Sequence, residues 1–288
     1  MPPRTVTDRT CLVTGAASGI GRATAIATAA RGGRLVLTDV NDEGLTAVAE
    51  RIGSSGGTVL FATALDISDH AAVAAMAEEV HEAHGSVDVV MNIAGVSAWG
   101  TVETLEHRHW RQMVDVNLMG PIHVIESFVP AMIAARRGGH LVNVSSAAGL
   151  IAMPWHAAYS ASKFGLRGVS EVLRFDLRRH DIGVSLVCPG GVDTNLVNTI
   201  EIAGIDREHP RVKRFTERFR EHADPPEHVA ELILKAIERN RYLVLTSREI
   251  KVAHWFQRKF APPYELAMRL INDRFTSILE STREPRSR

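Results

Sequence analysis

The sequence predicts an α/β fold in which a doubly wound parallel sheet of about seven strands carries helices on both faces. Three observations support this prediction. Short runs rich in Val, Leu and Ile alternate with longer Ala-rich stretches between Thr10 and Thr246. The short runs lack a regular alternation of apolar and polar residues, as expected for strands covered on both faces. The repeated order strand–helix–strand indicates parallel strands joined by right-handed crossovers.

The predicted strands are the short apolar runs Thr10–Thr14, Arg34–Thr38, Thr58–Thr63, Val87–Asn92, His140–Ser145, Ile182–Cys188 and Tyr242–Thr246. Helices are predicted between them where helix-forming residues dominate, as at Gly21–Arg31, Ala71–His84 and Ala161–Arg179. We therefore expect one domain over residues 1–247, followed by a helical extension over residues 248–288.

The composition is that of a soluble globular protein, with 45% hydrophobic and 23% charged residues. The 33 basic and 33 acidic residues cancel, so no net charge favours nucleic acid or an anionic membrane. Two cysteines in apolar runs, Cys11 and Cys188, argue against a disulfide scaffold and favour a reducing compartment such as the cytoplasm. No run reaches the roughly 18 uninterrupted apolar residues of a membrane span. No metal site is predicted.

A glycine-rich segment, Thr14–Gly21, stands directly after the first predicted strand, with glycines at positions 15, 19 and 21. Glycines let the backbone turn tightly and approach a ligand, and a helix N-terminus presents free N–H groups to a pyrophosphate. Such a trio also occurs in ordinary strand–helix turns. The preceding strand, the following helix and an acid about 20 residues later favour a dinucleotide site.

That acid is Asp39, at the end of the second predicted strand. A carboxylate there can accept hydrogen bonds from ribose hydroxyls and repels a 2′-phosphate. Val40 and Asn41 follow it, so no basic residue stands there to hold a phosphate. The sequence therefore favours NAD over NADP. The alternative is that Asp39 caps the helix that begins at Asn41–Glu43.

Tyr159 and Lys163 are four residues apart and share one face of a predicted helix. A phenol with the ordinary pKa of about 10 is a poor acid–base catalyst at neutral pH. A nearby ammonium is expected to lower that pKa, as is the positive charge of an oxidised nicotinamide. Ser146 lies thirteen residues before the tyrosine, at the end of a predicted strand. Ser145 is the less favoured neighbour.

At this point the chain resembles the short-chain dehydrogenase/reductase family in its single-domain, Rossmann-like form. The motifs that carry the resemblance are Thr14–Gly21, Asp39, Asp66 with Ile67, Asn92-Ile93-Ala94-Gly95, Asn117, Ser146, Tyr159 with Lys163, and Pro189–Thr194. One departure is minor. The family usually has Asn-Asn-Ala-Gly where this chain has Ile93 at the second position.

The resemblance implies an oxidoreductase with four catalytic residues. Tyr159 would give a proton to a carbonyl oxygen or take one from an alcohol, and Ser146 would hydrogen-bond the reacting oxygen. Lys163 would bind the nicotinamide ribose and lower the tyrosine pKa. Asn117 would hold a water that links Lys163 to solvent, although a helix cap or kink is an alternative for this residue.

The resemblance also implies which residues contact the cofactor. The predicted set is Gly15, Ser18, Gly19, Ile20, Gly21, Asp39, Asp66, Ile67, Asn92, Ala94, Gly95, Tyr159, Lys163, Pro189, Gly190, Val192 and Thr194. A homo-oligomer, dimer or tetramer, is implied as well.

The residues expected against the substrate are mostly apolar: Val96, Ser97, Trp99, Leu150, Met153, Trp155, His156 and the segment from Leu196. They favour a small hydrophobic alcohol or ketone. His156 is left out of the catalytic set, because a histidine beside Trp155 is more often simply packed. Residues from about 195 to 222 resemble the flap that closes over the substrate in this family.

The tail after Ser247 holds apolar residues at helical spacing after two prolines, from Tyr264 to Ile278. Three interpretations compete. The helix covers its own domain or a neighbouring subunit, it forms part of the substrate entrance, or it rests on a membrane surface. The last is the least favoured.

The predicted function is NAD-dependent interconversion of a hydrophobic secondary alcohol and its ketone. Two alternatives stay open. One is an NADP-linked 3-ketoacyl-type reductase, which Asp39 disfavours. The other is a non-catalytic dinucleotide-binding sensor, which would have no need for the complete set of catalytic residues.

Overall fold

A computed structural model describes residues 5–194, 201–205, 210–221 and 223–280. Seven strands form the main sheet: β1 (Thr10–Thr14), β2 (Arg34–Asp39), β3 (Thr58–Ala64), β4 (Val89–Asn92), β6 (Gly139–Val144), β7 (Ile182–Cys188) and β9 (Leu243–Leu245). Every predicted strand is present, with bounds that differ by at most a few residues.

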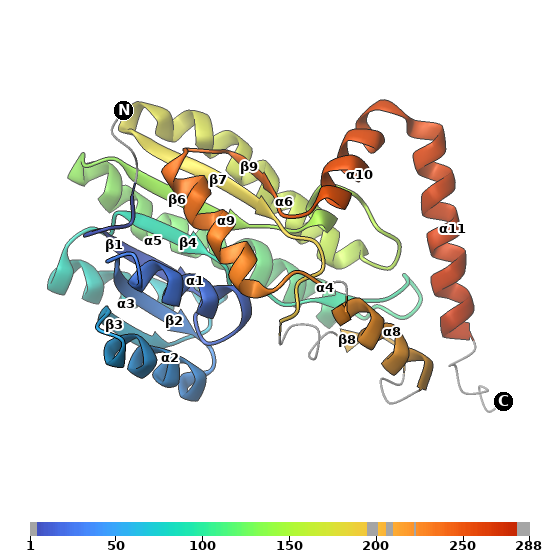
Figure 1. Ribbon diagram of the computed structural model, residues 1–288, viewed down its shortest axis with the longest axis horizontal. Coiled ribbons are helices and arrows are strands. Elements are labelled where there is room, and N and C mark those ends of the chain that lie inside the picture. The colour runs from blue at the N-terminus through green and yellow to red at the C-terminus, as the bar shows by residue number, and fades with distance from the viewer. Residues whose placement is uncertain (1–4, 195–200, 206–209, 222, 281–288) are drawn as a thin grey trace.

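The strand order is β3-β2-β1-β4-β6-β7-β9, and all neighbours are parallel (Figure 1). The chain winds outward in one direction from β1 and in the other from β4. The order therefore reverses between these two strands, and this confirms the predicted doubly wound fold.

A second, two-stranded parallel sheet pairs β5 (Ala98–Trp99) with β8 (Glu201–Ile202). This sheet is not predicted from the sequence, because a strand of two residues is too short to show an apolar pattern. The pairing holds the chain after β4 against the chain after β7, about 100 residues later.

The helices are α1 (Gly19–Ala29), α2 (Asp42–Ser54), α3 (His70–His84), α4 (His107–Val114), α5 (Gly120–Ala135), α6 (Ala157–Asp176), α8 (Pro210–Glu221), α9 (Pro226–Glu238), α10 (Arg248–Lys259) and α11 (Ala261–Glu280). Helix α6 begins four residues before the predicted Ala161, so Tyr159 lies within its first turn.

Side chains of the sheet alternate between two buried cores because successive residues of a strand point to opposite faces. Cys11 and Val13 of β1 pack with α1, α2 and α9, whereas Leu12 packs with α3 and α5. Helix α6 lies against β7. Helices thus cover both faces of the sheet (Figure 1).

The helical stretch His107–Ala135 is long and apolar enough, by length and composition, to cross a membrane. In this fold it is a core helix, because Val124 and Phe128 are fully buried against the sheet and α5 packs on α3. The sequence analysis required an uninterrupted apolar run, and Glu126 interrupts this one.

Helix α10 begins after Ser247, whose hydroxyl accepts a hydrogen bond from the Ile250 N–H (3.4 Å). Ile250 is buried, and α10 lies against β9. Helix α11 stands apart from the sheet (Figure 1). It includes Pro262 and Pro263 in its first turn, where proline is tolerated, rather than following them as predicted. Its Tyr264 hydroxyl donates to the Ala152 carbonyl (3.2 Å).

Candidate active site

Two cavities lie at the carboxyl ends of β1, β4, β6 and β7, where the strand order reverses. The glycine cavity, of about 250 Å³, is lined by the predicted residues Gly15, Ser18, Gly19, Ile20, Gly21, Asp39, Asp66, Ile67, Ala94, Gly95 and Thr194. The tyrosine cavity, of about 330 Å³, shares Ile20, Gly95 and Thr194 with it and adds the predicted residues Ser146, Tyr159, Lys163, Pro189, Gly190 and Val192.

Asn92 and Asn117 are the two predicted site residues that line neither cavity. The buried Asn92 side chain donates to Asn143 Oδ1 (2.9 Å) and to the Pro121 carbonyl (3.4 Å). It therefore ties β4 to β6 and to α5.

The glycine loop requires its glycines. Gly15 has φ +70°, and a Cβ there would lie 2.8 Å from the Ala94 Cα. The loop is fixed to the chain after β4 because Thr14 Oγ1 accepts hydrogen bonds from the Ala94 N–H (3.1 Å) and the Ile93 N–H (3.0 Å).

Ser18 is the N-cap of α1, but its side chain makes no capping hydrogen bond. The first-turn N–H groups of α1 are therefore available to an anion beside the glycine cavity. This arrangement fits the pyrophosphate of a dinucleotide, with the glycines allowing close approach.

Asp39 holds the turns on both sides of its carboxylate. Oδ2 accepts from the Ala17 N–H and Oδ1 from the Asn41 N–H, each at 2.9 Å. The cap of α2 is Asn41, whose side chain accepts from the Gly44 N–H (3.2 Å). Asp39 is therefore not the capping residue of α2, and its carboxylate lines the glycine cavity.

Asp66 and Ile67 lie on the far side of the glycine cavity. Oδ1 of Asp66 accepts from the Ser68 N–H (2.9 Å) and hydroxyl (2.8 Å), so the carboxylate is held in one orientation. Ile67 is buried and offers an apolar wall.

Ser145 and Ser146 both line the tyrosine cavity, but their hydroxyls differ. Ser145 Oγ donates to the Lys163 carbonyl (3.0 Å), so its proton is already used. Ser146 Oγ accepts from the Ala148 N–H (3.1 Å), and its hydroxyl faces the Tyr159 phenol, with which it shares a hydrogen bond. The geometry thus favours Ser146, the residue chosen from the thirteen-residue spacing.

Lys163 is only 4% exposed, and its Nζ donates to the Val144 carbonyl (3.1 Å) at the end of β6. Nζ lies 5.9 Å from the centroid of the Tyr159 ring. Burial lowers the pKa of Lys163 to about 8.

The pKa of Tyr159 is raised by burial, which outweighs the lowering by a hydrogen bond with Ser146. This differs from the sequence-based expectation that Lys163 lowers it. The ammonium is held by the Val144 carbonyl, and desolvation dominates at the phenol.

Asn117 lies in a π-helical turn, Asp115–Met119, between α4 and α5. Its Nδ2 donates to the Val96 carbonyl and its Oδ1 accepts from the Val96 N–H, each at 2.9 Å. A Cβ on Gly95 would lie 2.9 Å from Asn117 Oδ1 and 3.3 Å from Lys163 Nζ. Asn117 therefore lies where the helix departs from α-helical geometry, and its side chain fixes the loop beside Lys163.

Comparison with known proteins identifies the family of the chain. Residues 9–203 match the family model described as short chain dehydrogenase. A CLA biosynthesis dehydrogenase/reductase of Lactiplantibacillus plantarum is 31% identical over 255 residues, which cover 84% of this chain and 89% of that protein.

The chain belongs to the short-chain dehydrogenase/reductase family.

Two solved structures of this family are similar to the chain. One, from Burkholderia phymatum in complex with NAD, is 30% identical with a TM-score of 0.79, covering 90% of this chain and 96% of that one. A metagenomic short-chain oxidoreductase in complex with NADP is 35% identical with a TM-score of 0.65, covering 83% and 95%. The protein is therefore an NAD(P)-dependent dehydrogenase/reductase.

The substrate-side residues divide into two groups. Val96, Ser97, Trp99, Met153 and His156 line the tyrosine cavity as predicted. Leu150 is buried in the core behind it, Trp155 does not line it, and Leu196 lies outside the described residues.

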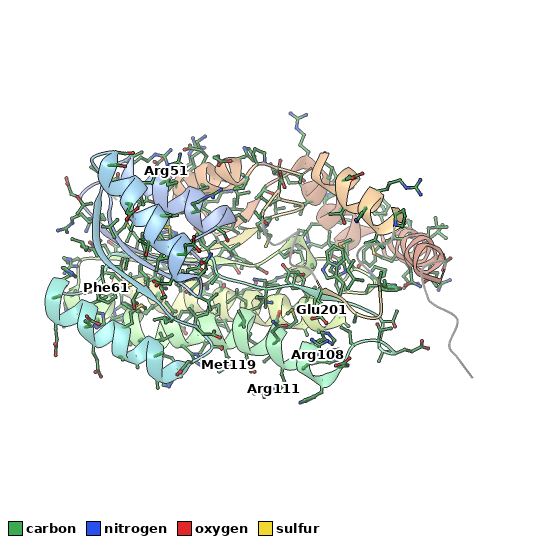
Figure 2. The ribbon with its side chains drawn as sticks, turned by 90° about the horizontal axis from the view of Figure 1, so that it is seen from below. Arg51, Phe61, Arg108, Arg111, Met119 and Glu201 are labelled. Carbon is green, nitrogen blue, oxygen red and sulfur yellow. The ribbon has the colours of Figure 1, made fainter. Side chains whose placement is uncertain are left out.

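The predicted flap is described in part, as β8 and α8. Glu201 of β8 accepts hydrogen bonds from Arg108 through both carboxylate oxygens (2.6 and 3.0 Å) and from His109 Nε2 (2.9 Å) on α4 (Figure 2). His109 Nε2 is the donor because Nδ1 accepts from the Glu106 N–H (2.8 Å). Arg108 and His109 together lower the pKa of Glu201 to about 2, so the contact stays charged at neutral pH.

The burial of Lys163 predicts that it destabilises the fold at neutral pH. A pKa of about 8 in the folded state against 10.5 in the unfolded state costs about 3 kcal/mol below pH 8. Lys163→Met also loses a hydrogen bond worth about 1 kcal/mol. The variant should therefore be more stable than the wild type by about 2 kcal/mol at pH 7, as measured by urea unfolding.

This gain should shrink as the pH rises from 8 to 10.5. In that range the unfolded state binds the Lys163 proton and the folded state does not, so wild-type stability rises with pH. Lys235→Met is the matched control, because Lys235 is exposed on α9 and its loss should leave stability within about 0.5 kcal/mol. A Lys163→Met variant less stable than the wild type at pH 7 would contradict this assignment.

Proposed function

We propose that the protein is an NAD-dependent oxidoreductase that interconverts a hydrophobic secondary alcohol and its ketone, with Tyr159 as the acid–base catalyst. The observation that supports it most is the convergence of Ser146, Tyr159 and Lys163 on one cavity with apolar walls that include Trp99 and Met153. A cavity of this kind suits an apolar substrate held by one reacting oxygen.

The nicotinamide, when bound, supplies or takes the hydride. In the oxidation direction, Tyr159 in its phenolate form takes the hydroxyl proton while the carbon loses a hydride. Ser146 donates its hydroxyl proton in a hydrogen bond to the reacting oxygen, which fixes the oxygen near the phenol. In the reduction direction, Tyr159 returns the proton to that oxygen. A buried phenol with a raised pKa holds its proton at neutral pH, so the protonated form that reduction of a carbonyl requires is the form present.

Lys163 is proposed to bind the ribose hydroxyls of the nicotinamide nucleotide. Its positive charge is proposed to stabilise the phenolate form of Tyr159. With a pKa of about 8, Lys163 can lose or gain a proton near neutral pH, unlike an ordinary lysine. Asn117 acts by holding the Val96 loop beside Lys163, where a relay water is proposed to link Lys163 to solvent.

Replacement of Tyr159 by Phe tests this function directly. The variant removes the proton donor but keeps the ring, so turnover of secondary alcohols such as 1-phenylethanol should fall by about 10²–10⁴-fold. Binding of NADH, measured by its fluorescence, should stay within about threefold of wild type. Single-turnover absorbance of the nicotinamide measures the chemical step.

Tyr242→Phe is the matched control, because it makes the same substitution at another tyrosine. The Tyr242 hydroxyl is buried without a hydrogen-bond partner among the described residues, and this tyrosine does not line the cavity. The control should keep full turnover. Turnover by Tyr159→Phe at the wild-type rate would refute the mechanism.

We infer NAD rather than NADP from the charge of Asp39. Each carboxylate oxygen accepts one backbone N–H and has a further lone pair for a ribose hydroxyl. A 2′-phosphate would bring a second negative charge against it. Val40, the next residue, is 74% exposed and offers no positive charge to offset this repulsion.

Kinetics with both cofactors test the preference. Wild-type kcat/KM should be at least about 5-fold higher with NAD, because repulsion of this kind costs about 1–4 kcal/mol near a protein surface. Asp39→Asn removes the charge at nearly constant size and should narrow the ratio, mainly by improving NADP. Asp42→Asn, an exposed acid three residues later, should leave the ratio unchanged. A wild-type preference for NADP would overturn the inference.

A further inference from the structure

His156 is a polar side chain in the tyrosine cavity that the mechanism does not use. It immediately precedes α6, three residues before Tyr159, and lines the same cavity as Ser146 and Lys163. Its side chain is 6% exposed, so the part that stays accessible opens into this cavity. The ring centroids of His156 and Tyr159 are 6.3 Å apart.

The proton of the His156 ring is located by its backbone partner. Nδ1 lies 2.7 Å from the Pro154 carbonyl oxygen. A carbonyl oxygen can only accept, so Nδ1 must be the donor and carry the proton. Burial lowers the pKa of His156, which keeps the ring neutral at neutral pH. Nε2 is then a bare acceptor.

Nε2 has no donor within the part of the chain that the structure describes. The ring lies 4.5 Å, centroid to centroid, from that of Trp99, whose indole N–H is given to Ser97 Oγ (2.9 Å). Met153, which lines the same cavity, has no hydrogen-bond donor to offer. Nε2 keeps some solvent-accessible surface, so a hydrogen-bond donor that enters the cavity can reach it.

The backbone around His156 fixes the direction of the ring. Trp155 has φ +69°, a left-handed conformation that bulky residues rarely adopt. Its carbonyl accepts from the Gly100 N–H (2.8 Å), and Gly100 and His156 form a β-bridge. A strained backbone of this kind persists only where the surrounding structure holds the residue in place. Here the surrounding structure holds Trp155, the residue directly before His156.

We propose that His156 determines substrate specificity by accepting, at Nε2, a hydrogen bond from a second hydroxyl of the substrate. This inference rests on the proposed function and names its substrate class. Tyr159 and Ser146 bind the reacting oxygen, and Nε2 binds a hydroxyl a few bonds away. The class is that of apolar diols and the hydroxyketones formed from them.

Two matched ketones test the proposal: 2-hydroxyacetophenone and acetophenone, which differ by one hydroxyl. Wild-type kcat/KM with NADH should favour the hydroxyketone by at least 10-fold, because a site built for a hydroxyl rejects the analogue that lacks it. Binding of each ketone to the enzyme–NADH complex, followed by NADH fluorescence, should show the same preference.

Two variants separate Nε2 from Nδ1. In His156→Asn the amide takes the position of Nδ1 and can still donate to Pro154, but nothing replaces Nε2, so the ratio between the two ketones should fall to about one. His156→Gln places an amide oxygen near the Nε2 position and should restore part of the ratio. His84→Asn, the same change at an exposed histidine of α3, should keep the wild-type ratio.

The outcomes keep the two proposals apart. The His156 proposal is overturned if the wild type reduces both ketones equally well. It is also overturned if the wild type binds both equally or binds neither. In each of these cases the proposed NAD-dependent reduction is tested with other ketones. If the wild type prefers the hydroxyketone in binding but reduces neither, the proposed function fails and the His156 proposal stands. An unchanged ratio in His156→Asn overturns the role of Nε2.

Discussion

Removal of the Lys163 ammonium from water is the constraint on which the rest of the site depends. The charge sits at the carboxyl end of β6, where one carbonyl, that of Val144, holds it. The same burial raises the pKa of Tyr159 and lowers that of Lys163 to about 8, so two groups whose pKa values are nearly equal in water move apart. Lys163 can therefore lose its proton near neutral pH while the Tyr159 phenol of the free protein keeps its own. The folded protein is less stable when the buried Lys163 is protonated. The packing of the surrounding sheet and α6 offsets this loss of stability.

The parallel sheet could be predicted almost completely from sequence because its strands are buried on both faces and therefore appear as short, continuous apolar runs. The β5–β8 pair could not. Its two-residue strands carry no pattern, and their pairing depends on the distant contact between Glu201 and Arg108. The stretch His107–Ala135 is a case in which a sequence pattern is present but ambiguous. Its length and composition alone do not distinguish a core helix from a membrane-spanning helix.

Most of the candidate site could also be predicted from sequence, since glycine turns and a Tyr–Lys pair one helical turn apart have few geometric solutions. Side-chain direction was the part that could not be predicted. Asn92 points into the sheet toward Asn143, and Lys163 points to a carbonyl that is not apparent in any spacing. His156 appeared to be a packed histidine, and only the Pro154 hydrogen bond shows which nitrogen is left to the cavity. These directions follow from tertiary contacts.

The titration of Tyr159 with and without NAD tests the central claim most directly. The chain has three tyrosines, so a Tyr242→Phe, Tyr264→Phe background leaves Tyr159 as the sole source of tyrosinate absorbance. The account predicts a pKa above the ordinary value of about 10 in the free protein and a fall of at least one unit when NAD binds. The fall should be smaller when Lys163 is replaced by Met. A pKa at or below 10 in the free protein, or one that NAD leaves unchanged, would contradict the account.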